Sequence, residues 1–271
     1  MALLLSSLLL WWQNKGSFGL PRENSPQAGP SRWAYSAAVG WVGFLLANEL
    51  LAMGSAFLPG QPVESAAGAA FSAWQQVLIA CGLEIGLLGI LLPLVLFDRR
   101  HPSADIGVEI GPKVSWSDVS WALDQGAKTF LLAVFPTAMA LILLAPIRPQ
   151  TEQHPFLQLL AESPDPALIG MLAVAVGVLA PLAEELIFRV ILQSGLGARW
   201  GPSRAWGTTA VLFALVHGWR DALALLPLAL LLGASFERHR SYLAVCTTHG
   251  LFNLTMLLLA LLTTKPAAAP L

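Results

Sequence analysis

Long apolar runs separated by short polar segments are the feature that most limits what this chain can fold into. A membrane helix needs about 20 apolar residues at 1.5 Å each, and most of the runs reach that length. Helices satisfy their own backbone polar groups in lipid, so we predict an all-α, polytopic membrane helix bundle with seven to eight transmembrane helices. The seven expected spans are about Ala34–Leu58, Phe71–Phe97, Val119–Ile147, Ala167–Leu196, Ala205–His217 (a shorter one), Ala222–Phe236 and Tyr242–Thr263.

The composition also indicates an integral, multi-pass membrane protein. Hydrophobic residues make up 56% of the 271 residues and charged residues only 11%, whereas a soluble domain has about 25% charged residues. The formal net charge is −1, which gives no basic field for nucleic acid. We therefore expect the lipid bilayer as a partner and no nucleic-acid partner.

Polar segments divide the chain into four parts. Residues 1–33 are predicted to be an N-terminal interfacial segment and polar linker. Within them the apolar Met1–Trp12 is too short to span comfortably, although a tilted eighth span is the alternative. Residues 34–113 would form accessory transmembrane helices, residues 114–263 the functional membrane core, and residues 264–271 a tail.

Lysine and arginine residues predict the orientation, because they concentrate on the cytoplasmic side of membrane proteins. With the amino terminus inside, ten of them flank the inner ends of the spans and three the outer ends, which favours a cytoplasmic amino terminus. The inner ones are Lys15, Arg22, Arg32, Arg99, Arg100, Lys113, Arg199, Arg204, Arg238 and Arg240, and the outer ones are Arg148, Arg220 and Lys265.

Three charged residues interrupt the fourth apolar run, at Glu184, Glu185 and Arg189. One charged side chain in the middle of a membrane helix costs roughly 2.5–3.5 kcal/mol, so such residues pair, line a wet cavity or carry function. Glu185 and Arg189 are four residues apart on one helix face and can pair. Glu184 is rotated by about 100° from Glu185. One carboxylate can therefore neutralise the arginine while the other is free for chemistry.

Other polar residues interrupt the fifth and seventh runs, at His217, His249 and Asn253. At 1.5 Å per residue, Glu184 and His217 lie roughly 18 Å from the inner ends of their helices, and His249 and Asn253 roughly 10 and 16 Å. All four side chains thus fall within one slab near mid-membrane, where they can meet.

The motifs Glu-Glu-x-x-x-Arg, Phe-x-x-x-His and His-x-x-x-Asn, in this order, resemble those of the CPBP (CAAX protease and bacteriocin-processing, Abi) family of intramembrane glutamic endopeptidases. The resemblance covers roughly Val114–Thr263 and implies a CPBP-type catalytic core. It implies that Glu184 and His217 activate a water, that His249 and Asn253 donate to the oxyanion, and that Glu185, Arg189 and Phe213 support the site. The expected activity is hydrolysis of a peptide bond in a membrane-embedded or membrane-proximal protein or peptide, without a cofactor.

Three other interpretations remain open at this point. Two histidines and a glutamate are plausible zinc ligands, but no His-Glu-x-x-His motif is present, and asparagine is a poor zinc ligand. A non-catalytic membrane scaffold or immunity-type protein would use the polar cluster only to join helices. A proton-coupled transporter would need two matching halves, which the sequence lacks. A bacterial inner membrane is the first expectation for the location, and an organelle membrane is the alternative.

Overall fold

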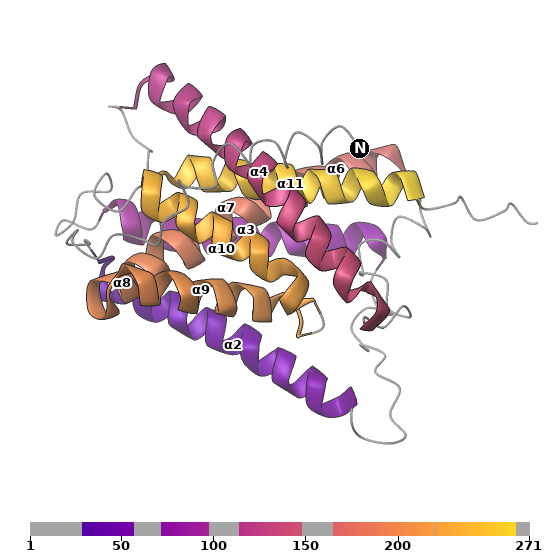
Figure 1. Ribbon diagram of the computed structural model, residues 1–271, viewed down its shortest axis with the longest axis horizontal. Helices are drawn as coiled ribbons and strands as arrows, with labels where there is room; N and C mark the ends of the chain where they lie inside the picture. Colours follow the sequence, from indigo (N-terminus) through magenta and orange to yellow (C-terminus); the bar gives the residue numbers. More distant parts are fainter. Residues whose placement is uncertain (1–28, 57–71, 98–113, 148–164, 220, 264–271) are drawn as a thin grey trace, which may run out of the picture.

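The computed structural model describes residues 29–56, 72–97, 114–147, 165–219 and 221–263. Every element in this part of the chain is helical (Figure 1). The order is α2 (Arg32–Ala56), α3 (Ala73–Leu96), α4 (Trp116–Leu144), the short 3₁₀ turn η3 (Ala145–Ile147), α6 (Pro166–Val174), η4 (Ala175–Leu179), α7 (Ala180–Glu185), η5 (Leu186–Gln193), α8 (Ser194–Trp200), α9 (Pro202–Val216), α10 (Ala222–His239) and α11 (Tyr242–Thr263).

The predicted all-α bundle is confirmed, and each of the seven expected spans falls on a helix of the structure. Six helices are long and apolar enough to cross a membrane: α2, α3, α4, the continuous helix α6–α8, α10 and α11. The seventh, α9, has 15 residues and extends only about 22 Å, which is shorter than the hydrocarbon core. Met1–Trp12 and the tail 264–271 lie outside the described residues.

The helix that carries the charged stretch runs from Pro166 to Trp200 and is not a regular α-helix. It begins where Asp165 caps its first turn and Pro166 occupies the first position. It ends at Gly201, whose φ of 85° suits glycine. Two π-helical segments, η4 and η5, lie on either side of the six-residue α7. Such segments widen the turn and frequently mark functional sites.

Helix α11 packs along α7 and η4 at unusually close range. Pro181 has no backbone N–H and so cannot bond the carbonyl of Gly177, four residues earlier. Gly250 of α11 approaches that carbonyl so closely that a Cβ atom on residue 250 would overlap its oxygen. A residue without a side chain at position 250 therefore allows the two backbones to meet beside the charged stretch.

Gly250→Ala is therefore expected to lower the free energy of unfolding by about 1–3 kcal/mol, because a methyl group there displaces backbone rather than a flexible side chain. Thermal unfolding of the purified protein in detergent measures the effect. Gly170→Ala, on α6 with open space around the new Cβ atom, is the control and should unfold at or above the parent temperature. An unchanged midpoint for Gly250→Ala would contradict the close approach.

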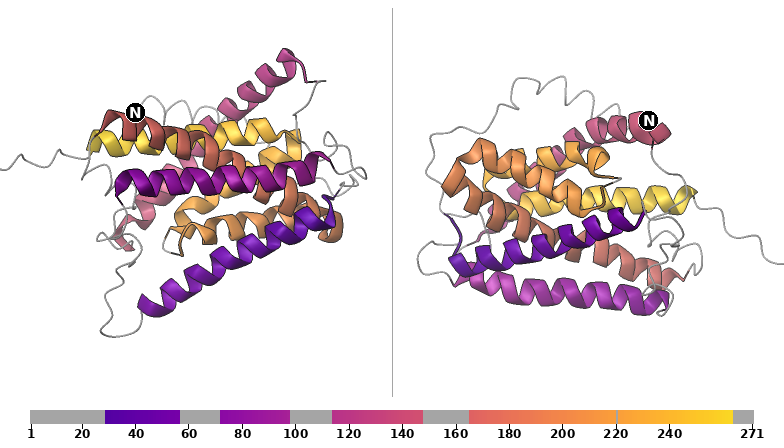
Figure 2. Two further views of the ribbon diagram at one scale, coloured as in Figure 1. Left: turned by 180° about the vertical axis from the view of Figure 1, so that it is seen from behind. Right: turned by 90° about the horizontal axis from the view of Figure 1, so that it is seen from below.

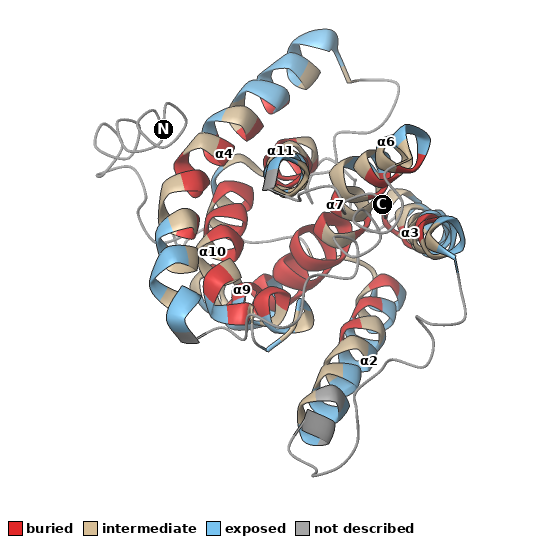
Figure 3. Ribbon diagram, turned by 90° about the vertical axis from the view of Figure 1, so that its right-hand side faces the viewer, coloured by how far each residue is buried: buried red, intermediate tan, exposed pale blue. Residues whose placement is uncertain are grey.

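Burial separates the core helices from the outer ones. Figure 3 shows buried residues concentrated on α7, α9, α10 and the neighbouring π segments, and exposed residues along α2, α3 and α4. The outer helices expose large apolar side chains, such as Leu51, Ile90 and Leu143, which is the pattern expected of faces in contact with lipid. In the left view of Figure 2, α2 crosses the bundle obliquely at its edge, and it contacts α9 and η5.

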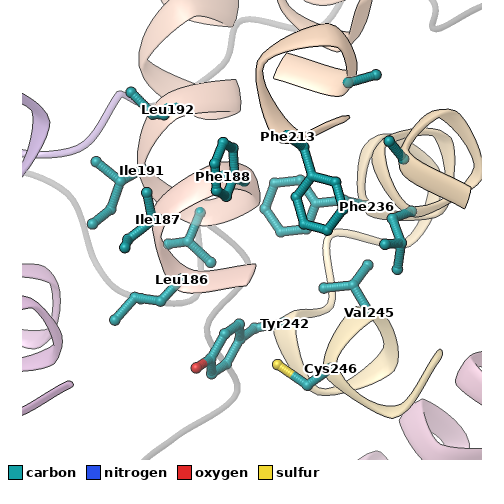
Figure 4. Packing of buried hydrophobic residues seen from close by; sticks show 14 of the residues in the cluster. Leu186, Ile187, Phe188, Ile191, Leu192, Phe213, Phe236, Tyr242, Val245 and Cys246 are labelled. Atoms are coloured by element: carbon teal, nitrogen blue, oxygen red, sulfur yellow. The ribbon is translucent and has the colours of Figure 1, made fainter. Parts of the chain in front are cut away.

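The inner core consists of aromatic and aliphatic side chains from η5, α9, α10 and the start of α11 (Figure 4). Phe188, Phe213 and Phe236 are fully buried there, and Tyr242 is 2% exposed. Since Arg189 of η5 lies among these side chains, the environment that surrounds it is apolar and tightly packed.

Candidate active site

The two adjacent glutamates point to different surroundings, as the helix period predicts. The Glu185 and Arg189 side chains are fully buried, with Arg189 Nε donating to Glu185 Oε2 at 2.9 Å. The Glu184 side chain is 26% exposed and faces two histidines instead. The predicted division between a pairing carboxylate and a free one is therefore confirmed.

His217 follows the last residue of α9 and contacts the free carboxylate. Its Nδ1 lies 2.7 Å from the carbonyl oxygen of Phe213, so this nitrogen must donate, because a carbonyl only accepts. Its Nε2 lies 3.3 Å from Glu184 Oε2. Since neutral imidazole with a donating Nδ1 has only a lone pair on Nε2, a hydrogen bond between these two residues requires a proton between them. Both side chains are partly exposed, at 28% and 26%.

His249 of α11 joins the two carboxylates from the other side. Its Nδ1 lies 2.8 Å from Glu185 Oε1, and its Nε2 lies 3.9 Å from Glu184 Oε2. Glu185 Oε2 accepts from Arg189, and Oε1 of the same carboxylate is the acceptor for Nδ1 of the histidine. Nε2 is therefore the ring nitrogen of His249 that faces Glu184, as it is in His217.

Phe213 forms the wall that these residues share. Its ring centroid lies 4.5 Å from that of His217 and 5.5 Å from that of His249. The Arg189 guanidinium carbon lies 5.0 Å from the same ring, within cation–π range. Arg189 Nη1 and Nη2 have no hydrogen-bond partner among the described residues. The ring face and Glu185 are therefore the main compensation for a buried cation.

Asn253 lies one turn beyond His249 on the same face of α11. Its Nδ2 donates to the carbonyl oxygen of Val176 in η4 at 2.9 Å. This bond fixes which end of the amide carries the hydrogens, and it uses one of two N–H groups. The structure thus brings Glu184, His217 and His249 into direct proximity, and it places Asn253 at the edge of this group.

Metal ligation was the rival interpretation of the same side chains. Among the described residues, no group of three His, Cys, Asp or Glu side chains is arranged to hold a metal ion. Both Nδ1 atoms are engaged, by Phe213 and by Glu185, so the Nε2 atoms are the ones that face Glu184. What this arrangement can do chemically is accept and return protons at Glu184 and His217, beside N–H donors from α11.

Two residues at this site were missed by the sequence analysis. Tyr242 Oη donates to the carbonyl oxygen of Leu182 at 2.5 Å, and Cys246 Sγ lies 3.6 Å from the carbonyl oxygen of Pro181. The signal that could have found them is their spacing, since residues 242, 246, 249 and 253 share one face of α11.

The comparisons with known proteins agree with the geometry. No curated protein and no solved structure matches the chain. Residues 166–255 match the family described as Rce1-like, type II CAAX prenyl endopeptidase. The match begins at the first residue of α6 and ends two residues after Asn253, so it includes all seven predicted site residues. Residues 166–255, which carry the three motifs and their convergence in space, are thus similar to the family described as Rce1-like, type II CAAX prenyl endopeptidase.

Proposed function

We propose that this protein is a glutamic-type intramembrane endopeptidase that hydrolyses a peptide bond in a membrane-embedded or membrane-proximal substrate without a metal. One observation carries the proposal. Glu184, His217 and His249 come from three separate helices and converge within 3.3 to 3.9 Å. The two residues that would handle the water are partly exposed, and the residues that support them are buried.

Glu184 and His217 would activate the water together. With the proton between them released, the Glu184 carboxylate and the His217 Nε2 lone pair can each accept a hydrogen from one water molecule. Proton transfer to Glu184 leaves a hydroxide that attacks the substrate carbonyl. The same proton can then pass to the leaving amine, so that the products are a carboxylate and an amine.

His249 and Asn253 would stabilise the negative charge that develops on the carbonyl oxygen. Asn253 keeps one amide N–H after its bond to Val176, and His249 Nε2 can donate once its ring carries a second proton. Glu185 accepts the Nδ1 hydrogen of His249 and would be the counter-ion for that charge. Fixed donors of this kind are typically worth about 2.7–4 kcal/mol each to the transition state.

The alternative function, a non-catalytic scaffold or immunity-type protein, explains one part of the site better than the other. The buried pair Glu185–Arg189 is what a structural role would produce. Glu184 and His217 do not fit a structural role, because a purely structural pair gains little stability from being partly exposed. An interhelical hydrogen bond in a membrane also averages only about 0.6 kcal/mol. The partial exposure of these two side chains therefore favours the enzyme.

Comparative peptidomics of membranes from cells that produce the parent or the Glu184→Gln protein tests the proposal. We expect membrane-derived peptides that appear only with the parent protein, and their ends identify the cleaved bond. A parallel sample treated with a zinc chelator should give the same peptides. Identical peptide sets from parent and variant would refute the peptidase, and loss of the peptides on chelation would favour a metal enzyme.

A further inference from the structure

The segment that carries Glu184 is poorly fixed by its own helix. Helix α7 spans only Ala180–Glu185 and has a π segment at each end. Pro181 removes one backbone donor inside it. Because this stretch of fewer than two turns lies between two irregular segments, contacts from a neighbouring helix contribute to its position.

Those contacts come from one face of α11. Tyr242 Oη donates to the Leu182 carbonyl at 2.5 Å, and Cys246 Sγ lies 3.6 Å from the Pro181 carbonyl oxygen. Both side chains are buried and project from neighbouring turns of α11 (Figure 4). They therefore hold the backbone two and three residues before Glu184.

The tyrosine bond is the stronger of the two contacts. A phenolic hydroxyl is a good donor and the carbonyl of a peptide is a good acceptor, whereas a thiol is a weak donor. The contact also joins residues 60 positions apart in the sequence, so it sets α11 and α7 in register with each other. The same helix carries His249 to Glu185 and Glu184. A shift at Tyr242 would therefore alter the distance between Glu184 and both histidines.

We propose that Tyr242 is a positioning residue, which fixes the Glu184 carboxylate for reaction by holding the Leu182 carbonyl. The inference rests on the proposed function but concerns a residue that none of the three motifs contains. Tyr242 donates to a backbone carbonyl of α7, two residues before Glu184. Its effect on the reaction passes entirely through the backbone of α7.

Tyr242→Phe tests the inference, because it removes the hydroxyl and keeps the buried ring. We expect kcat to fall roughly 10- to 100-fold with KM unchanged, as small misplacements of a catalytic group do. The matched control is Thr248→Val. Thr248 Oγ1 also donates from α11 to a carbonyl of another helix, Gly126 of α4 at 2.9 Å, and its other acceptor is Ala244 of α11 itself. The control should keep the parent kcat per folded molecule.

A second measurement reports on the position of the Glu184 carboxyl group and does not require substrate turnover. A hydrophobic carbodiimide labels membrane-embedded carboxyl groups, and mass spectrometry gives the labelling rate at Glu184. We expect this rate to change severalfold in Tyr242→Phe and to stay at the parent value in Thr248→Val. Unchanged kcat and unchanged labelling in Tyr242→Phe would overturn the inference, as would equal changes in the control. Absence of any cleavage by the parent would refute the proposed function, and the labelling rates would then decide the positioning role alone.

Discussion

Glu184→Gln is expected to lower kcat by about 10²- to 10⁴-fold, the range that a positioned proton-transfer group typically contributes. An amide keeps the shape of the carboxylate but cannot accept the proton of the attacking water. The side chain is 26% exposed and its partner is His217, so the protein should remain folded. The loss should therefore appear as a lower rate per folded molecule, measured with the substrate that peptidomics identifies.

The matched control changes a carboxylate to an amide where no chemistry is expected. Asp124 pairs with Lys128 on α4, and the two side chains are 52% and 56% exposed, so Asp124→Asn removes an ion pair that contributes little. It should keep the parent kcat. A double variant, Glu184→Gln with His217→Ala, should lose hardly more than Glu184→Gln alone, because residues that act as a unit are not additive. A Glu184→Gln protein with the parent rate would contradict the role of this residue.

The sequence predicted most of the site because helix period and depth are simple geometry. Two adjacent residues on a helix diverge by about 100°, which anticipated that Glu185 would pair with Arg189 while Glu184 faced elsewhere. Counting residues from the helix ends placed His217 and His249 within one slab of the membrane together with Glu184. These inferences did not require knowing which helices are neighbours, because polar side chains in membrane helices face the interior of the bundle and pair with one another.

The features that could not be predicted depend on contacts between helices. The π segments η4 and η5 leave no clear pattern in the apolar sequence from Pro166 to Gln193, because widened turns are stabilised by what packs against them. The role of Tyr242 likewise requires knowing that α11 lies against α7.

Loss of the charge on Glu185 should have the largest effect on stability. Glu185→Gln leaves the guanidinium of Arg189, which is 0% exposed, without its counter-ion. Breaking a buried ion pair by removing one partner typically costs about 3–5 kcal/mol, because the remaining charge stays buried. The variant also replaces the carboxylate that accepts from His249 Nδ1 by an amide, whose oxygen is a weaker acceptor. We expect a much lower folded yield and a lower unfolding midpoint than for Glu184→Gln, measured on protein purified in the same detergent.

The double variant Glu185→Gln with Arg189→Met separates the cost of a stranded charge from a general loss of packing. Methionine fills much of the space of the arginine stem and carries no charge, so the double variant should unfold at a higher temperature than Glu185→Gln alone. Phe213 would lose its cation–π partner, 5.0 Å away, so recovery should be partial. If the two substitutions lowered the free energy of unfolding additively, Glu185 would not be the residue that compensates the buried charge of Arg189. The buried pair would then not be what holds the wall of the site beside Glu184.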